Sequence, residues 1–217
     1  CLVENGVLQQ YAPPLEVYRR PENLFVADFV GNPSINFVEA KGTQQGDGSI
    51  SLDILGGVKA KFVTNENIKL NEWFESDAAK KQELLKGLMK DKHYVEKANK
   101  DEVFKYHIAK VMEEDSSIQS EPVVSNEDFV VAIRPEAIGI TSGEGLHTTI
   151  YGAMPTGMES TLKLRFGDYL LTGVIFGNTA YKIGENVNIN INGDDILLFD
   201  RRSGMRVATG YLVLENA

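Results

Sequence analysis

The residues of this chain that could carry out chemistry are scattered along the sequence. Its three histidines, His93, His107 and His147, lie far apart, and none has a partner at the i+4 spacing of a helical zinc site. The acidic pairs Glu113–Glu114 and Asp194–Asp195 fall at a predicted helix end and a predicted turn, where carboxylates are usually solvated. The sequence therefore predicts no metal site and no catalytic residue in this chain.

Nucleotide binding is also not predicted from the residues present. A phosphate-binding loop of the G-x-x-x-x-G-K-[ST] type cradles phosphates with its backbone amides and its lysine. The sequence contains no Gly-Lys dipeptide, and it also contains no G-x-S-x-G nucleophile elbow. We therefore expect this chain itself to bind no cofactor and to hydrolyse no ATP.

Composition and charge narrow the classes of partner. The 217 residues carry a net charge of −9 and have a pI near 4.9, which disfavours a phosphate backbone unless basic residues cluster. Only Arg201, Arg202 and Arg206 approach such a cluster, at a predicted hairpin tip, so nucleic acid is not an expected partner. The single cysteine, Cys1, fits a reducing compartment. No stretch approaches the ~18 uninterrupted apolar residues of a membrane span.

Two short helices are predicted between Pro13 and Gly31, after a hairpin at residues 2–10. Pro13 and Pro14 suit the first turn of a helix, where the missing N–H does no harm, and Pro21 ends this helix. Gly31 is expected to end the second helix. The apolar stripe predicted for the second helix consists of Leu24, Phe25, Phe29 and Val30.

Most of the remaining chain has the alternating pattern of half-buried strands. Three strands are predicted over residues 36–63, and further short strands follow from Asp128 onward. Glycine turns at intervals of about 8–12 residues favour a small closed barrel. Residues 65–122 differ, because lysine and glutamate dominate there. We predict two helices in this stretch, one with Ser76 as its N-cap and one that begins at Asp101 and carries Ile108 and Val111.

A pattern of fixed spacings between Pro14 and Phe37 reads P-x-EVY-x-RP-x-N-x-FVA-x-F-x-G-x-P-x-x-NF. This order resembles the segment that joins the nucleotide-binding domain to the C-terminal regulatory domain in ATPase subunits of sugar-importing ABC transporters, such as the maltose-type and glycerol-phosphate-type importers. Shorter likenesses occur at Ile133–Glu136, Thr156–Thr161 and Ile196–Asp200. The resemblance covers residues 1–63 and 123–208, and it is looser at Gln10–Pro13.

The resemblance implies the transport-associated OB-type (TOBE) fold. The expected fold class is mainly β (α+β overall), an OB-like antiparallel β-barrel with a leading helical pair and a helical insertion. Residues 1–31 would be the C-terminal tail of the nucleotide-binding domain. Residues 32–217 would be the regulatory domain, with the insertion at about residues 65–122. ATP and Mg²⁺ would then be held by an upstream domain that precedes Cys1.

The function implied by the resemblance is that of a regulatory and dimerisation domain. The parent would be the ATPase subunit of a carbohydrate-type ABC import system, which couples ATP hydrolysis to solute uptake. The implied partners are a second copy of the chain, membrane permease subunits and a regulatory protein. The implied location is cytoplasmic, peripheral to the inner face of the cell membrane. The alternative function is a barrel that senses a sugar or an oxyanion and thereby regulates transport.

Four residues are the candidates for an interaction or regulatory surface. Arg134 and Glu136 flank a proline after a predicted strand, and Gly157 and Glu159 lie in a predicted turn. From the residues alone, Arg134 and Glu136 predict a strand-ending turn with a local ion pair. The resemblance implies instead that all four help to form the contact surface of the regulatory domain.

Overall fold

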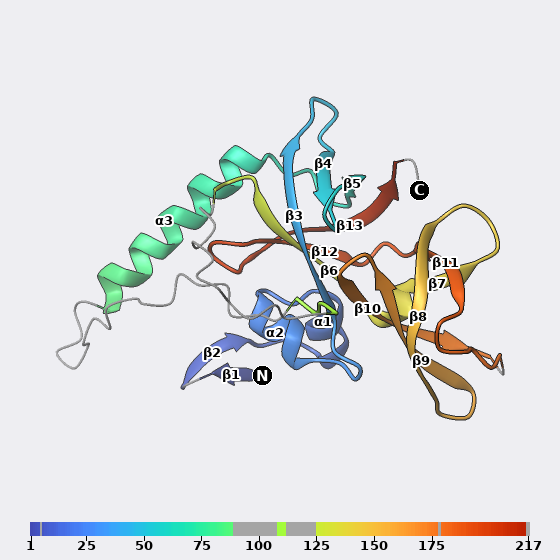
Figure 1. Cartoon of the computed structure of the whole chain (residues 1–217). Coiled ribbons are helices and arrows are strands. Elements are labelled where there is room, and N and C mark those ends of the chain that lie inside the picture. The colour runs from blue at the N-terminus through green and yellow to red at the C-terminus, as the bar shows by residue number, and fades with distance from the viewer. Residues whose placement is uncertain (5, 89–107, 112–124, 178, 216–217) are drawn as a thin grey trace, which may run out of the picture.

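The chain folds mainly into antiparallel strands (Figure 1). The computed structural model describes residues 1–4, 6–88, 108–111, 125–177 and 179–215. The chain begins with a hairpin and two short helices, as predicted: β1 (Leu2–Glu4), β2 (Val7–Gln10), α1 (Pro14–Arg19) and α2 (Leu24–Phe29). Gly6 adopts a φ of 82°, which the tight turn between β1 and β2 requires.

Six strands in the described part of the chain close into an antiparallel barrel in the order β12-β13-β5-β4-β3-β6. These strands are β3 (Asn36–Gln44), β4 (Ile50–Ile54), β5 (Val58–Thr64), β6 (Asp128–Ile133), β12 (Ile196–Asp200) and β13 (Arg206–Leu214). Because the barrel is closed, none of its strands presents an unpaired edge. The predicted mainly β fold with an OB-like barrel is confirmed.

A second sheet is inserted in the sequence between β6 and β12. Its strands lie in the order β10-β9-β8-β11-β7: β7 (Ile138–Thr141), β8 (Leu146–Pro155), β9 (Glu159–Phe166), β10 (Tyr169–Phe176) and β11 (Asn186–Ile191). The sequence pattern predicted strands here but included them in the barrel, and that assignment is wrong. Pro135 ends β6 and opens the short 3-10 helix η1 (Pro135–Ala137), which leads the chain out of the barrel.

One apolar core runs through the barrel and the second sheet. In β4 the alternate residues Ile50, Leu52 and Ile54 are buried, while Ser51 and Asp53 are only partly covered, as the alternating sequence predicts. The residues of the second sheet that join this core include Ile138, Ile150, Leu162, Leu164 and Ile189. The two sheets therefore share a single interior.

The buried side chain of Asn36 joins the barrel to the edge of the second sheet. Its amide nitrogen donates to the carbonyl oxygens of Ile133 (3.0 Å) and Thr172 (2.9 Å), and its amide oxygen accepts from the Thr172 N–H (2.6 Å). An asparagine can imitate one rung of a β-ladder in this way, because it offers both a donor and an acceptor. Asn36 thus satisfies backbone groups of β10 that no strand covers.

Helix α3 (Leu70–Leu88) confirms a helical part of the predicted insertion. It begins before Ser76, so the prediction of Ser76 as its N-cap is wrong. The acceptor at the start of the helix comes from the barrel, because the side-chain oxygen of Gln44 accepts from the Leu70 N–H (2.9 Å). Leu70 is buried, and the Phe74 ring lies 6.3 Å from the Phe129 ring of β6. The helix therefore packs its first turns against the barrel core.

The second helix predicted in the insertion lies mostly outside the described residues. Its described end, residues 108–111, is not helical: the Val111 N–H donates to the Asp168 carbonyl and the Leu170 N–H donates to the Ala109 carbonyl, both at 2.8 Å. The prediction of a helix through Ile108 and Val111 is therefore wrong. This short segment pairs instead with the edge of β10, which local propensity could not predict.

Helix α2 buries only part of the apolar stripe that the sequence predicted. Leu24, Val26 and Ala27 are buried, whereas Phe29 is 65% exposed. Asn23 caps the helix, because its side-chain oxygen accepts from the Val26 N–H (2.9 Å). Phe29 of the predicted stripe is exposed, since a six-residue helix is oriented by its tertiary contacts and not by its own periodicity.

Candidate functional site

The residue that best links the sequence prediction to the structure is Arg134, which follows β6. Its side chain is buried, at 5% relative exposure, and it lies against the ends of both leading helices. One terminal nitrogen donates to the Tyr18 carbonyl (2.8 Å), and the other donates to the carbonyls of Ala27 (3.3 Å) and Val30. The last carbonyls of a helix have no partner within the helix and carry partial negative charge. One guanidinium therefore completes the C-terminal ends of α1 and α2 together.

Tyr18 completes this cluster from the side of α1. The Arg134 guanidinium lies 4.0 Å from the centre of the Tyr18 ring, in the geometry of a cation–π contact. The Tyr18 hydroxyl donates to a carboxylate oxygen of Glu136 at 2.6 Å. Burial, together with Glu136, raises the pKa of Tyr18 to about 12, and burial lowers the pKa of Arg134 from its ordinary value.

The local ion pair predicted between Arg134 and Glu136 is not found among the described residues. Both side chains contact Tyr18 instead: Arg134 covers the ring and Glu136 accepts from the hydroxyl. Tyr18 was not a predicted site residue. Its only signal in the sequence was its place in the spaced pattern that begins at Pro14.

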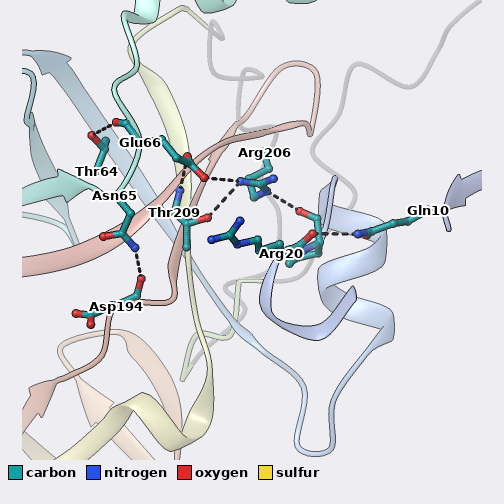
Figure 2. A network of polar contacts seen from close by, with 9 residues as sticks. Gln10, Arg20, Thr64, Asn65, Glu66, Asp194, Arg206 and Thr209 are labelled. Carbon is teal, nitrogen blue, oxygen red and sulfur yellow. Dashed lines mark hydrogen bonds and ion pairs between the residues drawn. The ribbon is translucent and has the colours of Figure 1, made fainter. Parts of the chain in front are cut away.

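A second polar network fastens the helical pair to the barrel through Arg206 at the start of β13 (Figure 2). The Arg206 side chain donates to the Pro21 carbonyl (3.1 Å) and to the Thr209 hydroxyl (3.2 Å), and it forms an ion pair with Glu66 (3.5 Å). The Arg206 backbone N–H also donates to the Glu22 carbonyl (2.9 Å). The turn between α1 and α2 is thus held by both the side chain and the backbone of Arg206.

Gln10, the last residue of β2, extends this network to the leading hairpin. Its side chain donates to the Arg20 carbonyl (3.0 Å) and accepts from the Glu22 N–H (3.1 Å), as Figure 2 shows in part. On the other side of Arg206, the Asn65 side chain donates to the Asp194 carbonyl (2.7 Å). Hairpin, helical pair, barrel and the loop before β12 are therefore connected by neighbouring polar contacts.

An apolar cluster covers the outer side of the barrel beneath α2. Every residue of β6 and β12 is buried, which is unusual for barrel strands whose outer side normally faces solvent. The outward side chains of these two strands pack against α2 and the segment after it. The cluster consists of Leu24, Ala27, Ile35, Phe37, Val130, Ala132, Leu197 and Phe199.

The structure separates the four predicted surface residues into two places. Arg134 is buried and Glu136 is exposed beside it. Gly157 and Glu159 lie at the turn between β8 and β9, where the Thr156 N–H donates to the Glu159 carbonyl (2.8 Å). No hydrogen bond or ion pair among the described residues joins the two places. Arg134 works inside the chain, and a contact role for the other three stays a prediction.

Exposed apolar side chains gather around Gly157 and Glu159. Met158 is 83% exposed within the turn itself, and Phe176 pairs with Glu159 across β9 and β10. We call this group the sheet-tip patch, and it consists of Met154, which pairs with Thr161, together with Met158 and Phe176. Exposed apolar groups of this kind commonly mark a protein contact.

The described residues offer little for metal or membrane chemistry. No group of three or more His, Cys, Asp or Glu side chains that could hold a metal ion is found among them. Within the same residues, no helix has both the length and the apolar character needed to cross a membrane.

The chain is similar to ATP-binding proteins of ABC transporters. Over 205 residues, 92% of the chain, it is 24% identical to the Bacillus subtilis protein named uncharacterized ABC transporter ATP-binding protein YurJ. Over 63 residues, 27% of the chain, it is 36% identical to the sn-glycerol-3-phosphate import ATP-binding protein UgpC of Escherichia coli K12. Over 54 residues, 24% of the chain, it is 42% identical to the osmoprotective compounds uptake ATP-binding protein GgtA of Synechocystis. No protein-family model matches the chain.

These matches cover only part of each relative. The matched stretches are 42% of YurJ, 18% of UgpC and 15% of GgtA, so the chain spans less than half the length of the curated relatives it matches. The predicted likeness to ATP-binding subunits of ABC importers is confirmed at this level, as a similarity over partial stretches to proteins of that kind.

Proposed function

We propose that this chain is a regulatory and dimer-forming part of the ATP-binding subunit of a carbohydrate-type ABC importer. The observation that carries the proposal is the similarity to an ABC transporter ATP-binding protein along 92% of a chain that has no phosphate-binding loop. The similarity to UgpC and GgtA, whose names describe import and uptake, directs the proposal to importers.

In this proposal the parent subunit hydrolyses ATP in a different domain, which also holds Mg²⁺. The barrel and the second sheet would pair with the same part of a second copy and keep two subunits together. Such a domain changes the balance between open and closed dimers only if its contacts differ between the two states. Membrane permease subunits and a regulatory protein are the further partners, at the cytoplasmic face of the membrane.

The sheet-tip patch is the surface that we assign to the second copy. Its apolar side chains, together with the turn at Gly157 and Glu159, project from the end of the second sheet and are not needed by the core. Burying them against an identical patch would remove apolar area from water, at roughly 25 cal/mol for each Å². The chain's charge of −9 opposes pairing, and added salt should therefore strengthen it.

Light scattering after size exclusion tests the pairing. We expect the chain to form a dimer that dissociates on dilution, and Met158→Asp and Phe176→Asp to shift the equilibrium at least tenfold toward monomer. Leu15→Asp is the matched control, because Leu15 is also exposed but lies on α1, away from the patch. A chain that stays monomeric at millimolar concentration, or a dimer that only Leu15→Asp disrupts, would contradict the assignment.

A further inference from the structure

The two leading helices are too short to be stable without help from the barrel. Each has six residues, whereas an isolated helix needs roughly twelve or more to be even marginally stable in water. The carbonyls of Tyr18, Ala27 and Val30, at the ends of these helices, receive their hydrogen bonds from Arg134, more than a hundred positions away. The local order of the helical pair therefore depends on a residue of the barrel.

We propose that Arg134 fastens the helical pair to the barrel, so that α1, α2 and the six barrel strands move as one rigid body. The connection at residues 30–35, where the sequence suggested a domain boundary, is then not a hinge. The inference concerns this chain alone and does not depend on the proposed function.

Gly31 at first suggests the opposite, because a glycine between two domains often serves as a joint. A Cβ atom at Gly31 would lie 2.9 Å from a terminal nitrogen of Arg134 and 3.4 Å from the Tyr18 ring. The residue also has a φ of 121°, a conformation that side chains rarely adopt. Gly31 is therefore required for close packing of the backbone beside the Arg134 guanidinium, which is the reverse of a free joint.

Separation of the helical pair from the barrel would break three attachments together. It would leave the buried Arg134 charge without its acceptors, which is strongly unfavourable. It would break the contacts of Arg206 with Pro21 and Glu22. It would also expose the apolar cluster beneath α2. Because these contacts lie at different points around the pair, no rotation preserves all of them.

If the proposed function holds, this rigidity has a mechanical meaning. A displacement that reaches the leading hairpin from a neighbouring unit would be passed to the barrel without loss at residues 30–35. The barrel would then report the position of that unit. A joint at Gly31 would have the opposite result, because the barrel could stay still while the helical pair moved.

Hydrogen exchange on the full chain tests the inference. The helix amides of Arg20, Ala27 and Val30 are bonded within α1 and α2, and those of β6 and β12 report the barrel. If the pair and the barrel open together, their protection factors should agree within about threefold. Protection of the helix amides that is a hundredfold lower than that of the barrel would overturn the proposal.

Arg134→Met isolates the role of the guanidinium. Because the pair and the barrel open in one event, we expect the helix amides and the slowest amides of β6 and β12 to exchange faster by a similar factor, at least tenfold. Arg165→Met is the matched control, because Arg165 is an exposed arginine whose hydrogen bond is local, to the Gly167 carbonyl. Acceleration confined to the helical pair, or none in the helical pair, would overturn the proposal that Arg134 fastens the pair to the barrel.

A milder variant keeps the test decisive if Arg134→Met does not fold. Tyr18→Leu removes the ring beneath the guanidinium and the hydroxyl bond to Glu136 but leaves the Arg134 charge paired with backbone carbonyls. We expect it to accelerate exchange in the helical pair and in the barrel by a similar factor, at least threefold. Unchanged exchange in α1 and α2 would count against the proposal.

Discussion

Two apolar residues of the same helix, Leu24 and Phe29, should respond to truncation in the order opposite to their size. Leu24 is 2% exposed and belongs to the cluster beneath α2, whereas Phe29 is 65% exposed. Truncating a buried leucine to alanine typically costs 2–5 kcal/mol, and we expect about 3 kcal/mol for Leu24→Ala. For a chain of this length that corresponds to a fall in Tm of roughly 6–12 °C.

The Phe29 ring has one clear aromatic neighbour, because its centre lies 5.8 Å from that of Phe25. Loss of an exposed ring contact of this kind should cost about 1 kcal/mol or less. Urea denaturation followed by circular dichroism measures both variants, and an unchanged m-value would show that the unfolded states are comparable. Leu24→Ala should therefore lower the unfolding midpoint much more than Phe29→Ala. The reverse order would refute the described position of α2 on the barrel.

Three further predictions follow from named contacts. Because the pKa of Tyr18 is raised to about 12 from about 10, its contribution to folding stability is complete below pH 10 and is lost as the pH rises through 12. Relative to Tyr18→Phe, the wild type should lose about 1 kcal/mol of unfolding free energy in this window, a value reduced for solvent exposure. A stability difference between the two proteins that stays constant with pH would contradict this. Gly210→Ala places a Cβ atom 2.1 Å from the Val63 carbonyl oxygen inside the barrel, so it should lower the free energy of unfolding by about 2 kcal/mol or prevent folding. Gly46→Ala is the control and should have little effect, because the space around Gly46 is open. Calorimetry with Mg-ATP should show no heat of binding, and thermal-shift screens with sugars, phosphate and molybdate should show no rise in Tm; a rise would favour the alternative of a small-molecule sensor.

Local signals in the sequence predicted those elements whose causes are local. Pro13 and Pro21 determine where the first helix begins and ends, and the alternation of Ile50, Leu52 and Ile54 indicates a strand with one buried face. The turn residues Asn5 and Gly6 indicate the leading hairpin in the same way. Each of these effects acts within a few residues, so the order of elements in the helical pair and the first barrel strands could be predicted.

The misses share a different cause, since each depends on residues that are distant in the sequence. Helix α3 begins before Ser76 because Gln44, on β3, supplies the acceptor at its start. The division of the later strands into a barrel and a second sheet depends on which strand each one pairs with, and alternation alone does not show this. Arg134 was predicted as a surface residue because its partners on α1 and α2 cannot be inferred from the turn in which it lies.

Among the candidate site residues, the sequence marked Arg134 but did not predict its contacts with the helical pair. The spaced pattern contained Tyr18 and a separate short likeness contained Arg134, yet only the fold shows that the two side chains are stacked on each other. Gly157 and Glu159 were marked as a turn, and the structure adds the exposed apolar residues around them. Exposure is a property of the folded surface, and a sequence with many apolar strands does not reveal which side chains it leaves outside.

The position of β13 in the barrel has a consequence for how the protein is made. This strand lies between β12 and β5, although β5 comes far earlier in the chain. A nascent chain on the ribosome therefore carries two unsatisfied strand edges until residues 206–214 have emerged from the exit tunnel. Such edges readily pair with other chains. Ribosomal stalling or premature termination before Arg206 would thus yield a sticky, half-open polypeptide that depends on chaperones to avoid aggregation.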